Sequence, residues 1–347
     1  MRLFVTGGGG FIGSAFLRRA LADGAVERLV CFDALTYSGR RENVTELEQD
    51  PRFRFVQGDI ADAAAVGAVF EAERPTAVVN FAAESHVDRS LFAARRFVQT
   101  NIEGTLCLLE AVRGLQDTAG AEAPRFLQVS TDEVYGDLGA DDDAFREDTP
   151  LAPRNPYSAT KAGADLLVQA FAETHGLWAV VTRSSNNYGP RQYPEKLIPL
   201  MITNAMEDRP LPVYGDGKNV RDWLWVDDNC EGVWAALTRG ESGQVYNLGG
   251  ESERENIQVV RGILAALDKP EGLIQYVGDR PGHDRRYAID CSRAAAALGF
   301  RPAVGFEEGL TRTVRWYCDN EAWWRPLRDA SFDAYYRTHY GKLGLRS

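Results

Sequence analysis

Apolar runs and amphipathic stretches alternate along the first half of the chain. Short apolar runs predict buried strands over residues 2–6, 28–33, 53–56, 77–81, 125–130 and 178–183. Apolar residues at helical spacing predict helices over residues 11–23, 63–73, 91–112 and 155–174. Because parallel neighbours need crossover connections, strands that alternate with helices indicate an α/β fold with a doubly wound parallel sheet, Rossmann-like in arrangement.

The pattern changes after residue 183, where prolines divide the chain into short elements. Residues 1–183 are therefore expected to form the dinucleotide-binding domain, and residues 184–347 a smaller C-terminal lobe that binds substrate. Strands predicted at 223–226 and 244–248 flank a helix at 227–237, so the chain is expected to return to the first domain over about residues 221–248. The polar, acidic stretch 136–153 predicts a surface loop.

Composition limits the partners of the protein. The formal net charge of −11 over 347 residues argues against nucleic acid, whose phosphates call for a basic face. The apolar runs are far shorter than the roughly 20 residues that cross a bilayer. The chain meets glycines directly after its first apolar run, which leaves no signal-peptide core, so we expect a cytoplasmic protein. Its five scattered cysteines suggest neither a metal site nor a disulfide framework.

Glycine spacing provides the first chemical signal. Gly7, Gly10 and Gly13 lie three residues apart, between a predicted strand and a predicted helix. Backbone without side chains can approach a pyrophosphate closely, and a helix N-terminus offers unpaired N–H groups. Asp33 follows Gly13 by 20 positions, at the end of the second strand, where a carboxylate accepts hydrogen bonds from the adenosine ribose. A carboxylate there repels the 2′-phosphate of NADP and favours NAD, although Arg40 and Arg41 lie nearby.

Other positions in the same turns are expected to border the cofactor. Asp59 follows the third strand and is equally well placed to cap a helix. The residues assigned to the cofactor besides the glycines and Asp33 are Phe11, Ile12, Thr36, Asp59, Ile60, Ala82, Tyr157 and Lys161.

Tyr157 and Lys161 lie four residues apart at the start of a predicted helix, which puts both on one face. To act as a base, a tyrosine must have its pKa lowered from about 10 toward 7, roughly 4 kcal/mol. A neighbouring ammonium and the nicotinamide charge would supply that bias. The pair alone is weak evidence, but here it follows a dinucleotide pattern and a strand that leads into Thr131, Asp132 and Glu133.

Together these motifs resemble those of the extended short-chain dehydrogenases and, within them, the dTDP-glucose 4,6-dehydratases. The resemblance covers nearly the whole chain. Its motifs lie at residues 6–13, 81–90, 130–136, 157–161, 186–190, 194–199, 220–223 and 280–284. Two departures are visible, Gly9 where alanine is common and Ser184-Ser185 where a cysteine is often seen.

The resemblance implies a redox-neutral lyase that uses NAD. Tyr157 would remove the 4-hydroxyl proton of the sugar while Thr131 orients that hydroxyl. Glu133 would then take the C5 proton, and protonated Asp132 would donate to the departing C6 hydroxyl. The catalytic set is therefore Thr131, Asp132, Glu133, Tyr157 and Lys161, and Asp132 needs a pKa raised by roughly 3 units through desolvation and the Glu133 charge.

An acidic protein must gather cations locally to hold a nucleoside diphosphate. Alone, each such cation is more often a surface ion pair. By resemblance, Arg221 and His283 would meet the diphosphate, with Asn187 and Asn256 assisting. The other residues expected to bind substrate are Ser85 and His86 near the hexose, Lys196, Leu197, Pro212 and Tyr214 around the base and its ribose, and the cation Arg280.

Two other functions compete with the dehydratase. A sugar-nucleotide 4-epimerase needs the oxidising tyrosine but no additional acid and base, and a regulatory NAD-binding protein needs neither. The Asp132-Glu133 pair disfavours both. The choice of pyrimidine depends on pocket shape and not on a motif. The expectation of thymidine therefore comes from the resemblance. Family precedent also implies a homodimer joined through the long helix after Ser90 and the Tyr157 helix.

Overall fold

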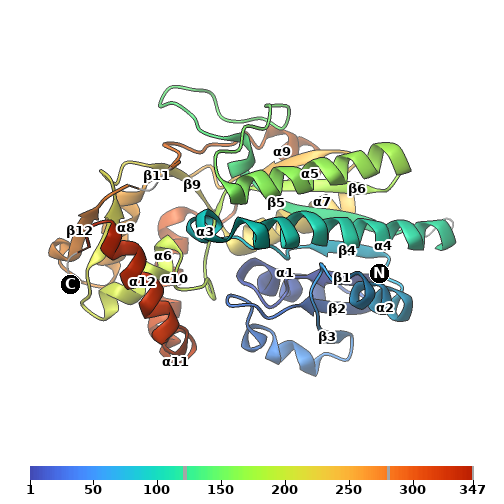
Figure 1. Cartoon of the computed structure of the whole chain (residues 1–347), viewed down its shortest axis with the longest axis horizontal. Helices are drawn as coiled ribbons and strands as arrows, with labels where there is room; N and C mark the ends of the chain where they lie inside the picture. Colours follow the sequence, from blue (N-terminus) through green and yellow to red (C-terminus); the bar gives the residue numbers. More distant parts are fainter. Residues whose placement is uncertain (120–122, 280–281, 346–347) are drawn as a thin grey trace.

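A computed structural model describes residues 1–119, 123–279 and 282–345 (Figure 1). Its centre is a seven-stranded sheet in the order β10-β6-β5-β4-β1-β2-β3, in which every neighbouring pair is parallel. The strands are β1 Arg2–Thr6, β2 Arg28–Asp33, β3 Phe53–Gln57, β4 Ala77–Asn80, β5 Arg125–Thr131, β6 Ala179–Ser184 and β10 Val245–Leu248. The predicted doubly wound parallel α/β fold is confirmed.

Helices cover both faces of this sheet. Side chains of α1 and α7 pack on one face, and side chains of α2, α4 and α5 pack on the other. The helices around the sheet are α1 Phe11–Leu21, α2 Ala63–Glu73, α3 Val87–Phe97, α4 Gly104–Ala119, α5 Pro156–His175, α7 Val226–Arg239 and α9 Ser292–Leu298. Because β1 lies between β2 and β4, the strand order reverses there, and a crevice forms beyond the carboxyl ends of these strands.

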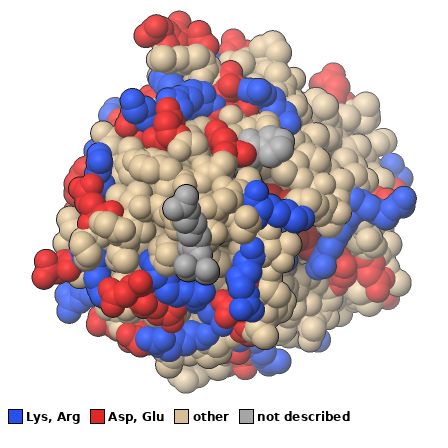
Figure 2. Space-filling model, turned by 60° about the vertical axis from the view of Figure 1, so that its left-hand side comes forward, with Lys and Arg blue, Asp and Glu red and all other residues tan. Residues whose placement is uncertain are grey.

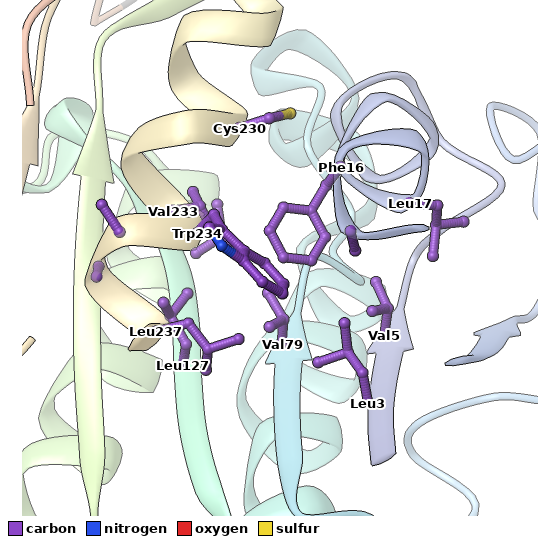
Figure 3. Close-up of a cluster of buried hydrophobic side chains, with 14 of the residues drawn as sticks. Leu3, Val5, Phe16, Leu17, Val79, Leu127, Cys230, Val233, Trp234 and Leu237 are labelled. Carbon is purple, nitrogen blue, oxygen red and sulfur yellow. The ribbon is translucent and has the colours of Figure 1, made fainter. Parts of the chain in front are cut away.

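Aromatic and aliphatic side chains fill the space between α1, α7 and the sheet (Figure 3). The rings of Phe16 on α1 and Trp234 on α7 face each other with centroids 6.1 Å apart. Leu3, Val5 and Val79 reach them from the sheet. This core fixes α1, and with it the turn that precedes α1, against β1.

A second lobe lies at the left of Figure 1. It contains a three-stranded sheet in the order β11-β9-β7 and a two-stranded sheet of β12 and β8. Its core surrounds Tyr188, Trp223 and Phe306. The elements are β7 Asn186–Tyr188, α6 Leu197–Met206, β8 Leu211–Tyr214, β9 Val220–Trp225, β11 Glu253–Glu255, α8 Asn256–Ala266, β12 Ile274–Val277, α10 Phe306–Asp319, α11 Glu321–Trp324 and α12 Ala330–Lys342.

Three segments differ from the sequence prediction. The helix expected over 91–112 begins earlier, at Val87, and passes through a π-helix at Val98–Glu103 before α4. The strand expected to end at 130 extends to Thr131, and the following residues form a 3₁₀ turn, Asp132–Tyr135. The return to the first sheet is made by α7 and β10, whereas β9 stays in the second lobe because it pairs with β7 and β11.

Lys and Arg side chains lie among Asp and Glu side chains over the face shown in Figure 2. In the described part of the chain, no helix is both long and apolar enough to cross a membrane.

Candidate active site

A cavity of about 460 Å³ lies at the carboxyl ends of the central strands. Both lobes contribute to its wall, because segments before residue 183 and the segment 184–196 line it together. The residues assigned from the sequence that line this cavity are Gly7, Gly10, Phe11, Ile12, Gly13, Asp33, Thr36, Asp59, Ile60, Ala82, Ser85, Thr131, Asp132, Glu133, Tyr157, Lys161, Asn187 and Lys196.

The glycine turn leaves no room for side chains. Gly7 has a φ of +67°, and a Cβ there would lie 2.6 Å from the Ala82 nitrogen. A Cβ on Gly13 would lie 2.2 Å from the Gly7 carbonyl oxygen. Within the described residues, no side chain caps the start of α1 at Gly10. The turn therefore brings bare backbone and a helix N-terminus to the cavity, which suits a pyrophosphate.

Asp33 lies at the end of β2 with its carboxylate turned back onto the turn. Its Oδ2 accepts from the Gly9 nitrogen at 2.8 Å, and its Oδ1 accepts from the Leu35 nitrogen at 2.7 Å. Burial raises the pKa of this carboxyl. Each oxygen still has acceptor capacity, as a ribose hydroxyl requires.

The alternative role suggested for Asp59, that of a helix cap, is taken by a different residue. Asp62 caps α2 by accepting from the nitrogens of Ala64 and Ala65 at 3.0 Å. Asp59 lies in the preceding turn, where its Oδ1 accepts from the Ala61 nitrogen at 2.9 Å. It lines the cavity together with Ile60.

Tyr157 and Lys161 lie on the first turns of α5, whose start is fixed by a capping box between Asn155 and Ser158. Both side chains are buried. The Lys161 Nζ donates to the Val129 carbonyl oxygen at 2.7 Å. Burial lowers the pKa of Lys161 to about 8, against the opposing charge of Asp165. The ammonium therefore begins to lose its proton near neutral pH.

The pKa of Tyr157 is raised in the protein without cofactor, whereas the sequence expectation of a lowered pKa included the nicotinamide charge. Burial and the nearby Glu133 carboxylate raise it instead of lowering it, while the Thr131 hydroxyl acts in the lowering direction. The expectation relied on the Lys161 ammonium together with the nicotinamide charge, and the protein alone supplies only the ammonium, whose Nζ donates to the Val129 carbonyl oxygen. Deprotonation of Tyr157 therefore needs a positive charge in the cavity besides the Lys161 ammonium.

Asp132 and Glu133 begin the 3₁₀ turn after β5, with the Thr131 side chain at its N-cap. Asp132 is 2% exposed. Burial, the Glu133 charge and the Asp222 charge raise its pKa well above the usual range, as the sequence predicted. The Thr131 Oγ1 donates to Asp132 Oδ1 at 3.3 Å, and Asp132 Oδ2 has no hydrogen-bond partner among the described residues. This environment favours the protonated form of Asp132.

Ser85, expected near the hexose, lines the cavity, as do Lys196 and Asn187, which were expected at the nucleotide. The Lys196 Nζ donates to the Ser85 carbonyl oxygen at 2.8 Å. His86 is buried, and burial lowers its pKa to about 4. Asn187 presents an Oδ1 that has no partner among the described residues.

Six other expected substrate residues belong to the second lobe and are not among the residues that line the cavity: Leu197, Pro212, Tyr214, Arg221, Asn256 and His283. The Arg221 Nη2 donates to the Asp284 carbonyl oxygen at 2.9 Å, and its guanidinium lies 4.3 Å from the Tyr287 ring centroid. Arg221 acts on Asp132 by lowering its pKa.

Other members of this group make contacts within the lobe. His283 Nδ1 lies 2.6 Å from Asp279 Oδ1, and the Tyr214 hydroxyl lies 2.7 Å from His339 Nε2. Asn256 begins α8, Leu197 begins α6 and Pro212 lies in β8. Arg280 lies outside the described residues.

Sequence reasoning missed several residues of the cavity wall. Tyr37 follows the assigned Thr36, and Glu195 precedes the assigned Lys196, so both lay within recognised segments. Gln99 and Thr100 lie in the π-helix, for which the sequence had no signal. The missed lining residues with polar side chains are Tyr37, Ser38, Glu84, Arg96, Gln99, Thr100, Ser130, Ser184, Ser185, Asn186, Gln192, Tyr193 and Glu195.

Comparison with known proteins is consistent with this geometry. The family model described as GDP-mannose 4,6 dehydratase matches residues 4–313. A dTDP-glucose 4,6-dehydratase of Xanthomonas campestris pv. campestris is 52% identical over 341 residues, which cover 94% of this chain and 96% of the relative. The chain belongs to the dTDP-glucose 4,6-dehydratase family.

Solved structures extend the family assignment to three dimensions. DesIV, a dTDP-glucose 4,6-dehydratase from Streptomyces venezuelae crystallised with NAD and dTDP, is 46% identical with a TM-score of 0.89, and the match covers 94% of this chain and 100% of DesIV. A UDP-glucose 4-epimerase of Thermus thermophilus in complex with NAD has a TM-score of 0.84 but only 31% identity, with 92% and 100% covered. The family resemblance inferred from the motifs is thus confirmed.

Proposed function

We propose that this chain is an NAD-dependent lyase that converts dTDP-glucose to dTDP-4-keto-6-deoxyglucose. The observation that carries the proposal is the buried Asp132, which lies next to Glu133 and in the same cavity as Tyr157, and whose pKa is raised by burial and by the Glu133 charge. An acid and a base that adjoin an oxidising tyrosine are what loss of water requires.

The first step is oxidation at C4. The bare-backbone turn and Asp33 fit NAD, which when bound supplies a hydride acceptor at C4 and later the donor at C6. Thr131 orients the 4-hydroxyl, and Tyr157 takes its proton. Because the pKa of Tyr157 is raised in the protein alone, the nicotinamide charge and the Lys161 ammonium have to offset burial and Glu133.

The second step is elimination. The 4-ketone acidifies the C5 proton, which Glu133 removes as the base. Asp132 donates its proton to the C6 hydroxyl, which leaves as water. The hydride then returns to C6 and a proton returns to C5, so the reaction needs no external reductant.

The second lobe supplies the nucleotide contacts in this proposal. Arg221 and His283 hold the diphosphate, assisted by Asn187 and Asn256, while Lys196, Leu197, Pro212 and Tyr214 surround the thymidine. The unpartnered Oδ1 atoms of Asn187 and Asn256 among the described residues support this, since buried amide oxygens are normally bonded. Arg280 stays a sequence prediction.

We also propose a homodimer. Large apolar side chains lie exposed on α3, on the following π-helix and on α5, and α3 packs against α5 in the same layer (Figure 1). The exposed side chains are Leu91 (38%), Phe92 (74%), Val98 (40%) and Leu166 (56%). A second copy of this chain would cover them.

All five cysteines are free, which supports a location in the reducing cytoplasm.

One experiment tests the proposed activity. Purified protein incubated with dTDP-glucose, without added NADH, should yield a product lighter by one water in a mass spectrum. An epimerase would give no mass change and a new diastereomer, which nuclear magnetic resonance would reveal. Either an unchanged mass or a requirement for added NADH would contradict the proposal.

A further inference from the structure

A cluster of polar and aromatic side chains joins the two lobes at the rim of the cavity. The Tyr37 hydroxyl donates to Glu195 Oε1 at 2.7 Å. The Arg89 Nε donates to Glu195 Oε2 at 3.0 Å, and the Arg89 guanidinium lies 4.0 Å from the Tyr37 ring centroid. Tyr37 and Arg89 belong to the first lobe and Glu195 to the second. We call these three residues the interlobe clasp.

The clasp is more strongly built than a surface ion pair. The Glu195 side chain is only 2% exposed, yet both of its carboxylate oxygens are bonded. A buried carboxylate with charge-assisted bonds is stabilised in one geometry, whereas exposed pairs contribute little. The Tyr193 ring packs edge-on against Tyr37 with centroids 5.5 Å apart. The clasp therefore fixes the loop that contains Tyr37 to the second lobe.

The clasp lies between the side of the cavity proposed for the cofactor and the segment proposed to bind the substrate. Tyr37 follows Thr36 in the loop that leaves Asp33, on the side of the cavity proposed for adenosine. Glu195 precedes Lys196, which is proposed to contact the nucleotide of the substrate. Closure of the clasp holds the cofactor loop and the substrate segment together.

The proposed reaction requires the cofactor to stay bound through both hydride transfers. In the proposed reaction, the hydride removed from C4 must return to C6 from the same cofactor molecule. If the cofactor left after the first step, a ketone would remain with no reductant. We propose that Tyr37, Arg89 and Glu195 form an interlobe clasp that retains NAD between removal and return of the hydride. This inference depends on the proposed function.

Tyr37→Phe tests the clasp most cleanly, because it keeps the ring beneath Arg89 and removes only the bond to Glu195. The dissociation rate of labelled NAD from the purified holoenzyme should rise roughly tenfold, as expected for loss of a hydrogen bond to a charged group. Glu195→Gln should raise it further. During turnover, both variants should release NADH and unreduced keto sugar together in equal amounts.

Glu46→Gln is the matched control. Glu46 also bridges the lobes, between Arg18 of the first and Arg191 of the second, but it does not line the cavity. This variant should keep the parental NAD dissociation rate. If Tyr37→Phe also keeps that rate, or if Glu46→Gln raises it equally, the clasp proposal is overturned. The NAD measurement needs no turnover, so its outcome is separate from the test of water loss.

Discussion

The two halves of the proposed site, one for the cofactor and one for the substrate, are built in different ways. The cofactor half, Gly7 to Gly13 with Asp33, Thr36, Ile60 and Ala82, consists of backbone and short turns at the ends of neighbouring strands. The proposed substrate half combines Asn187 and Lys196, which line the cavity, with side chains from separate second-lobe segments outside the lining, Tyr214, Arg221, Asn256 and His283. Backbone geometry is set locally, whereas side-chain convergence depends on the whole fold. Substitutions should therefore affect the two halves through different measurable quantities.

The largest effect is expected where the halves meet. Asp132→Asn removes the proton donor for the C6 hydroxyl but leaves Tyr157 and the cofactor half intact. The turnover number should fall by about 10² to 10⁴, as for loss of a general acid. C4 oxidation should persist, so rapid mixing should reveal NADH absorbance that builds up on the variant and not on the parent. Undiminished turnover would contradict the role of Asp132.

The raised pKa of Asp132 should also make the stability of the fold depend on pH. Its pKa is raised in the folded state, so the proton held there stabilises the fold at acid pH, and this contribution is lost as pH rises through the folded pKa. Asparagine has no such loss. In thermal unfolding measured across the pH range, the melting temperature of Asp132→Asn should therefore rise relative to that of the parent as pH rises. A difference independent of pH would mean that Asp132 is not protonated in the fold.

The second largest effect is a loss of NAD affinity, which should follow from a change in the cofactor half alone. Gly13→Ala places a methyl group 2.2 Å from the Gly7 carbonyl oxygen, so the turn must shift. NAD affinity, measured by calorimetry, should fall by at least roughly a hundredfold, equivalent to ~2.7 kcal/mol.

Gly67→Ala on α2 is the matched control, since its Cβ meets nothing within 4 Å. It should stabilise the protein by about 0.5–1 kcal/mol without changing NAD affinity. Equal NAD affinity in Gly13→Ala and the parent would remove the turn from the cofactor site.

The third effect should be confined to the substrate half. Arg221→Gln should raise the KM for dTDP-glucose roughly 10- to 100-fold, the range for a charge-assisted bond, while NAD content stays unchanged. Arg312→Gln, which alters an exposed ion pair with Glu308, should leave KM as in the parent. If Arg221→Gln lost NAD and substrate affinity together, the two halves would not be separable.

The smallest effect is a fall of activity at alkaline pH. The pKa of Lys161 is lowered to about 8 by burial, so its ammonium is lost as pH rises through that value. With it goes the charge that favours the Tyr157 phenolate. The kcat/KM for dTDP-glucose should therefore fall as pH rises through about 8, and Lys161→Arg should move this fall to higher pH because arginine keeps its charge. A flat profile up to pH 10 would contradict the assignment.

The comparison of the two halves also explains how much the sequence could predict. The glycine turn and Asp33 were predictable because their spacing and their neighbouring strand and helix are local features. The desolvation of Asp132 was expected from the mechanism that the resemblance implies, and the motifs around the carboxyl pair made a solvated strand end the less favoured alternative.

Features that depend on long-range packing were missed. Tyr37 and Glu195 are 158 positions apart and meet only when the lobes pack together. The π-helix at Val98–Glu103 has no sequence signature, so Gln99 and Thr100 were missed with it. The raised pKa of Tyr157 comes from burial and from Glu133, a neighbour across the cavity that spacing along α5 does not reveal.

The central claim is that one cofactor molecule carries a hydride from C4 to C6 while water leaves. It is tested most directly with dTDP-glucose that carries deuterium at C4, incubated with the purified protein in unlabelled water. Mass spectrometry and deuterium resonance should find a product lighter by one water with the deuterium in the C6 methyl group. Deuterium that stayed at C4, or that was lost to solvent, would contradict the account.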